Sequence, residues 1–362
     1  MRKLTIFLLL IFPILSFTSL QSYAQGKKSR NIILFIGDGM GVTQWYAGMA
    51  VKKEQMNIEK FSNSGFSKTY STSHFSADGA SAGTAMASGV KTYNGAVGLG
   101  NDTLPVKTIL EYAKEKGIAT GIVTANTLME GSISPFVAHE KSRMLTENIA
   151  AAYVENEIDV FIGGGSKFFT ERKDKRNLVD ELKQKGYQVV FSINEIRKIR
   201  QGRLAGFTSA DNNPTLSEGR GTMFPDAVET AINILSKIRK GFILVVENSF
   251  PDRASHLEDG ELVALETIDL DNAVGKALDF ALKDGNTVVI VTAGQEASGM
   301  SIAEGSITDG TIKPKWTEPG MIHTGVMVPV FAFGPGSEVF SGIQENTAIF
   351  HKMMALMRLK TK

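Results

Sequence analysis

Three residues could together ligate one divalent cation. Asp252 and His256 are four positions apart, so on a helix they would share one face. His323 precedes a Thr-Gly pair and could supply a third ligand. A carboxylate combined with two imidazoles suits zinc. The alternative is purely structural, with Asp252 as a helix cap, His256 on the helix surface and His323 as an ordinary loop histidine.

Two further carboxylates directly follow or end apolar runs. Asp38 lies between two glycines just after residues 31–36, and Glu247 ends the run that starts at residue 242. A Gly-Asp-Gly sequence can simply form a turn. Glu247 is more informative, because a buried carboxylate costs free energy unless it is paired or bound to a cation.

The elements that would position these residues are strands and helices in alternation. Most of the predicted strands are continuous apolar runs, which suit a parallel sheet buried on both faces. They cover residues 31–36, 119–124, 160–162, 187–191, 242–246, 287–291 and 328–333. Helical spacing occurs between them, at 106–116, 226–240 and 262–282. The alternation predicts an open α/β sandwich.

Polar and glycine-rich residues follow several of these strands. In open parallel sheets ligands bind at the carboxyl ends of the strands, so we expect the site there. Residues 201–224 contain many Gly, Ser, Asn and Thr residues with little periodicity. They are predicted to form a surface loop or small lid within a single domain that covers residues 25–362.

Residues 1–24 are predicted to be a secretory signal peptide. Arg2 and Lys3 precede an apolar stretch, and cleavage is expected after Ala24. The alternative is an uncleaved N-terminal anchor. No later stretch holds eighteen uninterrupted apolar residues, so we expect a secreted or periplasmic protein with no membrane association in its mature form.

Composition narrows the chemistry further. The chain has 362 residues, of which 43% are hydrophobic and 21% charged, as in a globular protein. Its formal net charge of +1 gives no support to nucleic-acid binding. It has no cysteine, which excludes disulfides, thiolate ligands and a thiol nucleophile. Any metal must therefore be held by oxygen and imidazole groups.

Several segments, in this order, resemble the alkaline phosphatase family. They are Ile36-Gly37-Asp38-Gly39-Met40-Gly41, Ser88-Gly89-Val90-Lys91-Thr92-Tyr93-Asn94-Gly95-Ala96, Val245-Val246-Glu247 followed by Asp252 and His256, and His323-Thr324-Gly325 leading to Val328. The resemblance implies a three-layer sandwich with helices on both faces of a mostly parallel sheet. It also implies hydrolysis of phosphate monoesters with two zinc ions, one magnesium ion and a serine nucleophile, often in a homodimer.

The resemblance supplies complete ligand sets for two cations. The residues that it implies for the first zinc are Asp252, His256 and His323. Those that it implies for magnesium are Asp38, Ser132 and Glu247, with Ser132 replacing a threonine. Arg143 corresponds to the arginine that holds two phosphoryl oxygens. Glu130 stands at a position that is often acidic or histidine in the family.

The second zinc site does not match the family. Where the family has Asp-Ser-Ala-Ala, this chain has Asp78-Gly79-Ala80-Ser81, which places Gly79 at the nucleophile position. Where the family has Thr-Ala-Asp-His, the last two residues here are Gly294 and Gln295. Glycine offers no ligand, and a neutral amide is a poor zinc ligand. The sequence therefore predicts a pseudoenzyme that binds phosphate or a phosphate monoester, with activity lost or strongly reduced.

Three alternatives would preserve some turnover. Ser81 could replace the nucleophile, although on a helix it would point about 200° away from position 79. A zinc-bound hydroxide could attack the ester directly, with inversion at phosphorus. Finally, the metal site could be rebuilt from other residues, of which Glu296 is the nearest spare carboxylate.

Overall fold

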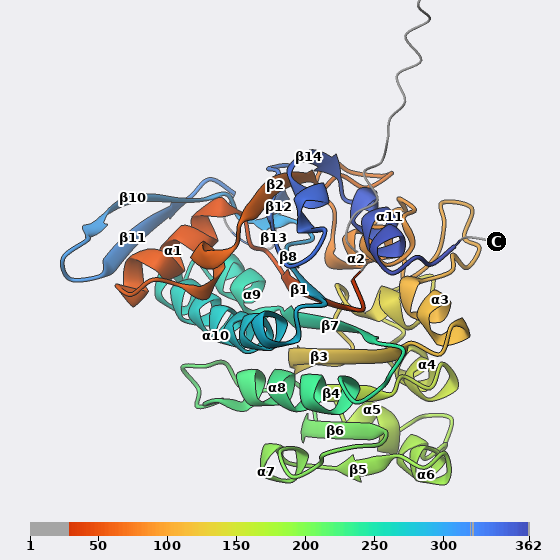
Figure 1. The fold of residues 1–362 in the computed structure, drawn as a ribbon. Helices are drawn as coiled ribbons and strands as arrows, with labels where there is room; N and C mark the ends of the chain where they lie inside the picture. The colour runs from red at the N-terminus through yellow and green to blue at the C-terminus, as the bar shows by residue number, and fades with distance from the viewer. Residues whose placement is uncertain (1–28, 319, 321, 361–362) are drawn as a thin grey trace, which may run out of the picture.

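A ten-stranded sheet forms the centre of the protein in the computed structural model, which describes residues 29–360 except 319 and 321 (Figure 1). The predicted signal peptide lies outside the described residues. In sheet order the strands are β14 (Gly342–Glu345), β2 (Asn63–Lys68), β13 (Val328–Phe333), β8 (Thr287–Thr292), β1 (Asn31–Gly37), β7 (Phe242–Asn248), β3 (Ala119–Thr127), β4 (Val160–Gly164), β6 (Leu204–Ser209) and β5 (Gln188–Val190). Only β13 runs antiparallel to its neighbours, so the predicted mostly parallel sheet is confirmed.

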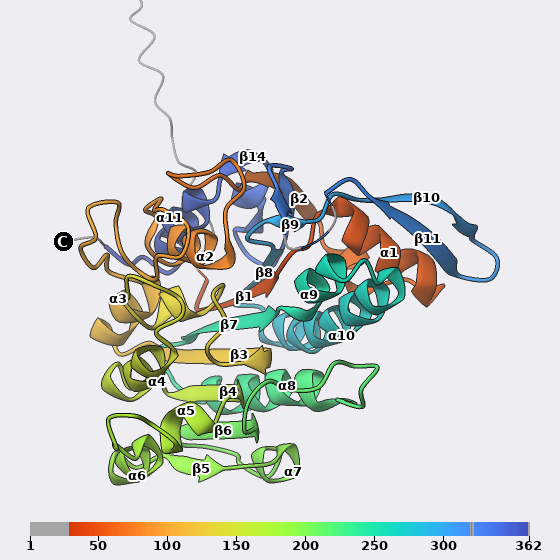
Figure 2. The same ribbon diagram turned by 180° about the vertical axis from the view of Figure 1, so that it is seen from behind.

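Helices cover both faces of the sheet (Figures 1 and 2). One face carries α1 (Val42–Lys52), η1 (Asn57–Lys60), α7 (Ile193–Ile196), α8 (Met223–Leu235), α9 (Phe250–His256) and α10 (Gly260–Asp284). The other carries α2 (Gly79–Ser88), α3 (Ile109–Glu115), η2 (Ser134–Phe136), α4 (Thr146–Glu155), α5 (Lys167–Thr170), α6 (Leu178–Gln184), η3 (Ser337–Phe340) and α11 (Thr347–Leu356). The three-layer prediction is confirmed.

Strand β1 shows why a continuous apolar run suits this sheet. Ile32, Leu34 and Ile36 pack into the core on one face, whereas Ile33 and Phe35 pack into the core on the other. Successive side chains of a strand point to opposite faces, so a strand covered on both sides needs apolar residues throughout.

All seven predicted strands are present, but three strands of the sheet were not predicted. The loop prediction for residues 201–224 is wrong over Leu204–Ser209, which form β6 between β4 and β5, and α8 begins at Met223. Backbone pairing with both neighbours stabilises β6 despite its glycine, threonine and serine. Strands β2 and β14 were missed because they are short and rich in polar residues and glycine.

Two small antiparallel pairs lie outside the main sheet. The hairpin β10 (Met300–Ser306) and β11 (Thr311–Trp316) extends beside α1 (Figure 1). The pair β9 (Glu296–Ala297) and β12 (His323–Thr324) joins the chain after β8 to the segment before β13. This second pair fixes His323 close to the carboxyl end of β8.

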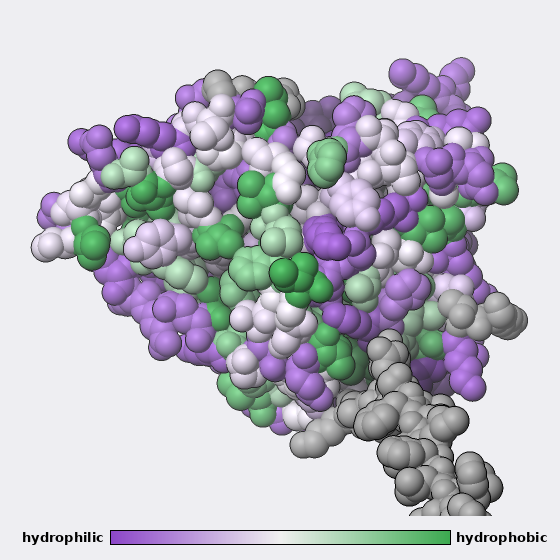
Figure 3. All heavy atoms as spheres, turned by 90° about the horizontal axis from the view of Figure 1, so that it is seen from above, coloured by the Kyte–Doolittle hydropathy of each residue, from purple (hydrophilic) through white to green (hydrophobic). Residues whose placement is uncertain are grey.

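The face nearest β2 and β14 exposes some apolar side chains. In Figure 3, which views the molecule from above, apolar and polar groups are interspersed on this face. Phe66 of β2 and Ile343 of β14 pair in register and are both exposed. No helix formed by the residues that the structure describes has the length and apolar character needed to cross a lipid bilayer.

Candidate metal centre

The strand register gathers the predicted site residues at one edge of the sheet. Ile36 pairs with Glu247 on one side and with Thr292 on the other. Thr124, in the carboxyl-terminal half of β3, also pairs with Glu247. The residues that follow β1, β7 and β8 therefore emerge together, as expected for the carboxyl ends of parallel strands.

Asp252, His256 and His323 form a compact cluster. One ligand atom from each lies within 4.8 Å of the others. Helix α9 places Asp252 and His256 on one face, with His256 Nε2 3.2 Å from Asp252 Oδ2. His323 comes from β12 and its Nε2 lies 3.3 Å from Asp252 Oδ1. Residues distant in sequence thus meet at the spacing that one small cation needs.

The two histidines of this cluster are oriented by backbone carbonyls. His256 Nδ1 lies 2.8 Å from the Gly320 oxygen, and His323 Nδ1 lies 2.9 Å from the Ala77 oxygen. A carbonyl only accepts, so each Nδ1 donates and each Nε2 faces the cluster. Histidines that ligate metals are commonly held in this way.

The charges of the cluster reinforce one another. Burial opposes ionisation of Asp252, but its hydrogen bonds with His256 and His323 outweigh burial and lower its pKa. Burial likewise lowers the pKa of His323, but the hydrogen bond and charge of Asp252 outweigh it and raise that pKa to about 9. The carboxylate therefore favours positive charge at this position, either a proton or a cation.

A second group of residues surrounds Glu247, which is fully buried. Its Oε2 accepts a hydrogen bond of 2.5 Å from Thr124 Oγ1, and its Oε1 accepts one of 3.2 Å from Ser132 Oγ. Burial raises the pKa of Glu247 well above its ordinary value, and the charges of Glu130 and Asp38 raise it further. Oxygen ligands gathered in this way suit magnesium.

Asp38 is buried beside this group and is incompletely paired. Its Oδ1 has no hydrogen-bond partner among the described residues. Burial and the charge of Asp252 raise the pKa of Asp38 to about 7. A buried carboxylate oxygen without a partner costs free energy, and a bound cation would offset that cost.

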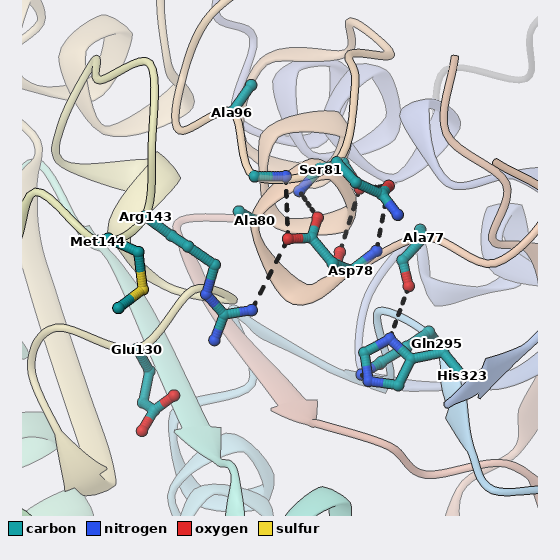
Figure 4. Close-up of polar contacts among 12 residues, drawn as sticks. Ala77, Asp78, Ala80, Ser81, Ala96, Glu130, Arg143, Met144, Gln295 and His323 are labelled. Atoms are coloured by element: carbon teal, nitrogen blue, oxygen red, sulfur yellow. Dashed lines mark hydrogen bonds and ion pairs between the residues drawn. The ribbon is translucent and has the colours of Figure 1, made fainter. Parts of the chain in front are cut away.

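Arg143 reaches the same region from the segment before α4. Its Nη1 lies 3.7 Å from Asp78 Oδ2, and its side chain is about one-third exposed (Figure 4). Gly131 allows this approach, because a Cβ atom at that position would lie 2.8 Å from the Arg143 Cζ atom. Burial raises the pKa of Glu130, and the positive charge of Arg143 offsets part of this increase. Arg143 thus adds a cationic group to an acidic pocket.

Gly79 is the first residue of α2 and faces Asp38. A Cβ atom placed on Gly79 would lie 3.3 Å from Asp38 Oδ2 and 3.2 Å from the Ser132 backbone nitrogen. A longer side chain here would point into the site. Ser81 does not replace it, because its hydroxyl donates to the Asp78 carbonyl and to Asn94 Oδ1.

Gln295 is fully buried beside the Asp252–His256–His323 cluster. Its Nε2 donates to Asp252 Oδ1 at 3.0 Å and lies 3.2 Å from His323 Nε2. A Cβ atom on the preceding Gly294 would lie 3.7 Å from Asp38 Oδ1. Residues 294 and 295, which the family resemblance aligns with ligands of a second zinc, thus offer a bare backbone and an amide.

The carboxylate of Glu296 is occupied by neighbouring groups. One of its carboxylate oxygens accepts from Gln44 Nε2 at 2.7 Å and from the Met300 nitrogen at 3.2 Å. The other accepts from the Gly299 nitrogen and the Thr324 hydroxyl. The carboxylate is used by the turn around β9, so the interpretation of Glu296 as a spare ligand loses its support.

Some residues of the site were not found from the sequence. Thr124 binds Glu247, and Asn126 Nδ2 donates to Glu130 Oε1 at 2.7 Å. Asp78 caps α2 through the Ser81 nitrogen and also contacts Arg143. Pairing the predicted strands in register would have pointed to Thr124, whereas the contact between Asp78 and Arg143 depends on tertiary packing.

Comparison with known proteins identifies the family to which this chain belongs. A family model described as alkaline phosphatase matches residues 29–316. The chain belongs to the alkaline phosphatase family. Alkaline phosphatase 3 of Bacillus subtilis is 30% identical, over 94% of this chain and 93% of that protein. Alkaline phosphatase 4 of the same organism is 31% identical, over 88% of this chain and 86% of that protein.

Solved alkaline phosphatases share the fold. That of the Antarctic bacterium TAB5 is 35% identical, with a TM-score of 0.87, over 92% of this chain and all of that one. A histidine-to-aspartate variant of it, with the same identity and TM-score, was solved with Mg bound in its M3 site. The resemblance predicted from the motifs is confirmed, and the family is one of phosphate-monoester hydrolases.

Proposed function

We propose that this member of the alkaline phosphatase family is an exported phosphate-binding protein whose phosphomonoesterase activity is lost or strongly reduced. It binds one zinc ion through Asp252, His256 and His323. It binds magnesium through a second set of residues, Asp38, Ser132 and Glu247. Arg143 holds the oxygens of inorganic phosphate or a phosphate monoester in a bidentate contact.

The observation that carries this proposal is that residues 79, 294 and 295 present no nucleophile and no zinc-binding side chain to the site. Gly79 and Gly294 both face Asp38 and supply no side chain. Gln295 presents an N–H group, not a lone pair, toward Asp252. A second zinc ion would have Asp38 Oδ1 nearby but none of the other ligands found in the family.

The donor sets favour the two retained cations. Two oriented imidazoles and a carboxylate suit zinc, and buried oxygen groups suit magnesium. When bound, the cations supply positive charge that stabilises a phosphoryl group. Arg143 pairs with Asp78, and its positive charge also acts on Asp38 and Glu130 of the site. These features support binding, whereas the missing nucleophile removes the first step of the family's double displacement.

Metal content and activity, measured on one preparation, test the proposal. Mature protein equilibrated with zinc and magnesium should contain about one zinc per chain. Turnover of p-nitrophenyl phosphate should lie many orders of magnitude below that of a conventional relative, since removing a nucleophile can cost about a millionfold in kcat. Isothermal titration should still detect binding of inorganic phosphate.

Three results would change the assignment. Two zinc ions per chain would reject the single-zinc site. Family-typical turnover or a covalent phosphoprotein would reject the loss of the nucleophile. Slow turnover that disappears in His256→Ala would favour direct attack by water, and inversion at a chiral phosphorus would confirm that route. Fractionation of the native host tests export.

A further inference from the structure

Gln295 lies against two of the three residues proposed to hold zinc. Its Nε2 is 3.0 Å from Asp252 Oδ1 and 3.2 Å from His323 Nε2. Figure 4 shows Gln295 beside His323. His323 Nδ1 is bonded to the Ala77 carbonyl, so Nε2 is the atom of His323 left to bind a cation. The amide nitrogen therefore approaches the same two residues that a cation would need.

The orientation of this amide is fixed by Gly39. The Gly39 backbone nitrogen donates to Gln295 Oε1 at 3.2 Å, and a backbone N–H can only donate. The oxygen must therefore face Gly39, and the NH₂ group must face the cluster. Gly39 itself has φ +72°, and a Cβ atom there would lie 2.5 Å from Asp252 Cα. The backbone that holds the amide is thus packed directly on the cluster.

A donor in this place opposes a cation. Gln295 donates to Asp252 Oδ1, the oxygen that also lies 3.3 Å from His323 Nε2, so a cation placed between Asp252 and His323 must share that oxygen with the amide N–H group or displace it. The partial positive charge of the N–H group also repels any positive charge placed between Asp252 and His323. Where the family has a histidine ligand, this chain has a group that satisfies the neighbouring ligands without a metal.

We propose that Gln295 competes with the divalent cation for the Asp252–His256–His323 cluster and so weakens its affinity. The inference rests on the proposed function, because it takes this cluster as a cation site. The amide stabilises the cluster when no cation is bound and must be displaced when one binds. Gln295 therefore makes zinc binding weaker than the three ligands alone would give.

A second buried glutamine provides a matched control. Gln44 is also fully buried, accepts a hydrogen bond from a glycine nitrogen (Gly41) at 3.0 Å, and donates to a carboxylate (Glu296) at 2.7 Å. It contacts none of the three cluster residues among its hydrogen bonds. Replacing either glutamine removes a similar set of hydrogen bonds, but only one replacement removes the proposed competitor.

The experiment compares Gln295→Met with Gln44→Met and the unmodified protein. Methionine keeps a similar volume and cannot donate. Purified, metal-free proteins are titrated with Co²⁺, followed by its visible absorption, and with Zn²⁺ by calorimetry. We expect Gln295→Met to bind either ion about tenfold more tightly, the equivalent of about one hydrogen bond. Gln44→Met should keep the original affinity, while both metal-free variants should unfold at lower temperature.

Unchanged or weaker binding by a folded Gln295→Met protein, with one ion still bound by the unmodified protein, would overturn this inference alone. No binding of either ion by any of the proteins would overturn the proposed metal site as well. Gln295→Glu gives a second test, because it replaces the donor by a carboxylate of the same shape. It should bind more tightly than the unmodified protein, and equal affinity would contradict the competition.

Discussion

Gly79 leaves the first turn of α2 without a side chain that faces Asp38. Gly79 has an ordinary helical backbone, so any side chain could stand there, and its Cβ direction leads to Asp38. The neighbouring Ser81 is turned toward Asp78 and Asn94, as its position two residues farther along a helix predicts. The Ser81 hydroxyl therefore does not take the direction that a side chain at position 79 would have.

Restoring the missing residues should restore activity only in combination. The triple change Gly79→Ser, Gly294→Asp and Gln295→His supplies a nucleophile and two zinc ligands. A Cβ atom at position 294 would lie 3.0 Å from the Ala82 Cβ, so Ala82→Gly should improve folding of the variant. We expect p-nitrophenyl phosphate turnover and a phosphoserine in the combined variant.

Gly79→Ser alone is the control for that reversion, and it should remain inactive because no second zinc activates the serine. Activity of the single variant would show that the second cation site had not been lost. Inactivity of the combined variant, with two zinc ions bound, would show that the positions have been wrongly aligned.

Arg143 gives a simpler test at the same scale. Its replacement by Ala removes charge-assisted hydrogen bonds, which are worth about 1.5–3 kcal/mol each. The affinity of the metal-loaded protein for inorganic phosphate should fall by at least about tenfold. Arg197→Ala is a suitable control, because Arg197 pairs with Asp226 of α8 and has no contact with the site residues in that pair. Equal phosphate affinity in both variants would remove Arg143 from the site.

At the scale of elements, a buried ion cluster ties the segment before α8 to α10. Arg220 bonds to Glu266, and its Nη2 lies 2.7 Å from Asp269 Oδ2. Glu266 also accepts from the Leu216 nitrogen and from Asn248 at the end of β7. The irregular segment after β6 is therefore held by charged hydrogen bonds and not by regular secondary structure.

This cluster should make stability depend on pH. Burial raises the pKa of Asp269 from 3.8 to about 6, against the opposing charge of Arg220. Between these values the folded protein holds a proton that the unfolded chain has released, so the free energy of unfolding falls as pH rises. A shift of this size corresponds to about 3 kcal/mol. Urea unfolding from about pH 4 to pH 6 should show this decrease.

Asp269→Asn cannot take up that proton, so its stability should vary less over the same interval. The difference in unfolding free energy between Asp269→Asn and the unmodified protein is the quantity to compare. If that difference stays constant with pH, the carboxyl of Asp269 titrates normally in the folded protein.

At the scale of the whole molecule, the site lies at one edge of a sheet that carries an apolar core on each face. The two cores share the strands of the sheet, and the proposed ligands come from the carboxyl end of β7, from α9, from β12 and from the segment after β1. Binding of the two proposed cations would thus join α9, β12, the end of β7 and the segment after β1. A ligand that binds only the folded state stabilises it by mass action.

Zinc should therefore raise the melting temperature of the metal-free protein. At a free zinc concentration about 100 times the Kd, the gain in unfolding free energy is about 2.7 kcal/mol. Differential scanning calorimetry should show an increase with zinc that EDTA reverses. His256→Ala should abolish the increase, and an undiminished increase in that variant would place zinc elsewhere.

The sequence by itself determined the strands of the sheet centre, the family, and the type of ligand available at most site positions. This was possible because fully buried strands must be apolar throughout, and because ligand chemistry follows from residue type. The polar strands β2, β6 and β14 could not be predicted this way, since pairing with neighbours stabilises them.

Only the tertiary structure decided which hydrogen bonds Gln295 and Glu296 make. Gln295 could have been an exposed polar residue, but the Gly39 nitrogen turns its amide toward Asp252. Glu296 was a candidate ligand until its contacts with Gln44 and Thr324 were known. Hydrogen-bond direction depends on groups far apart in the chain, so residue type alone cannot fix it.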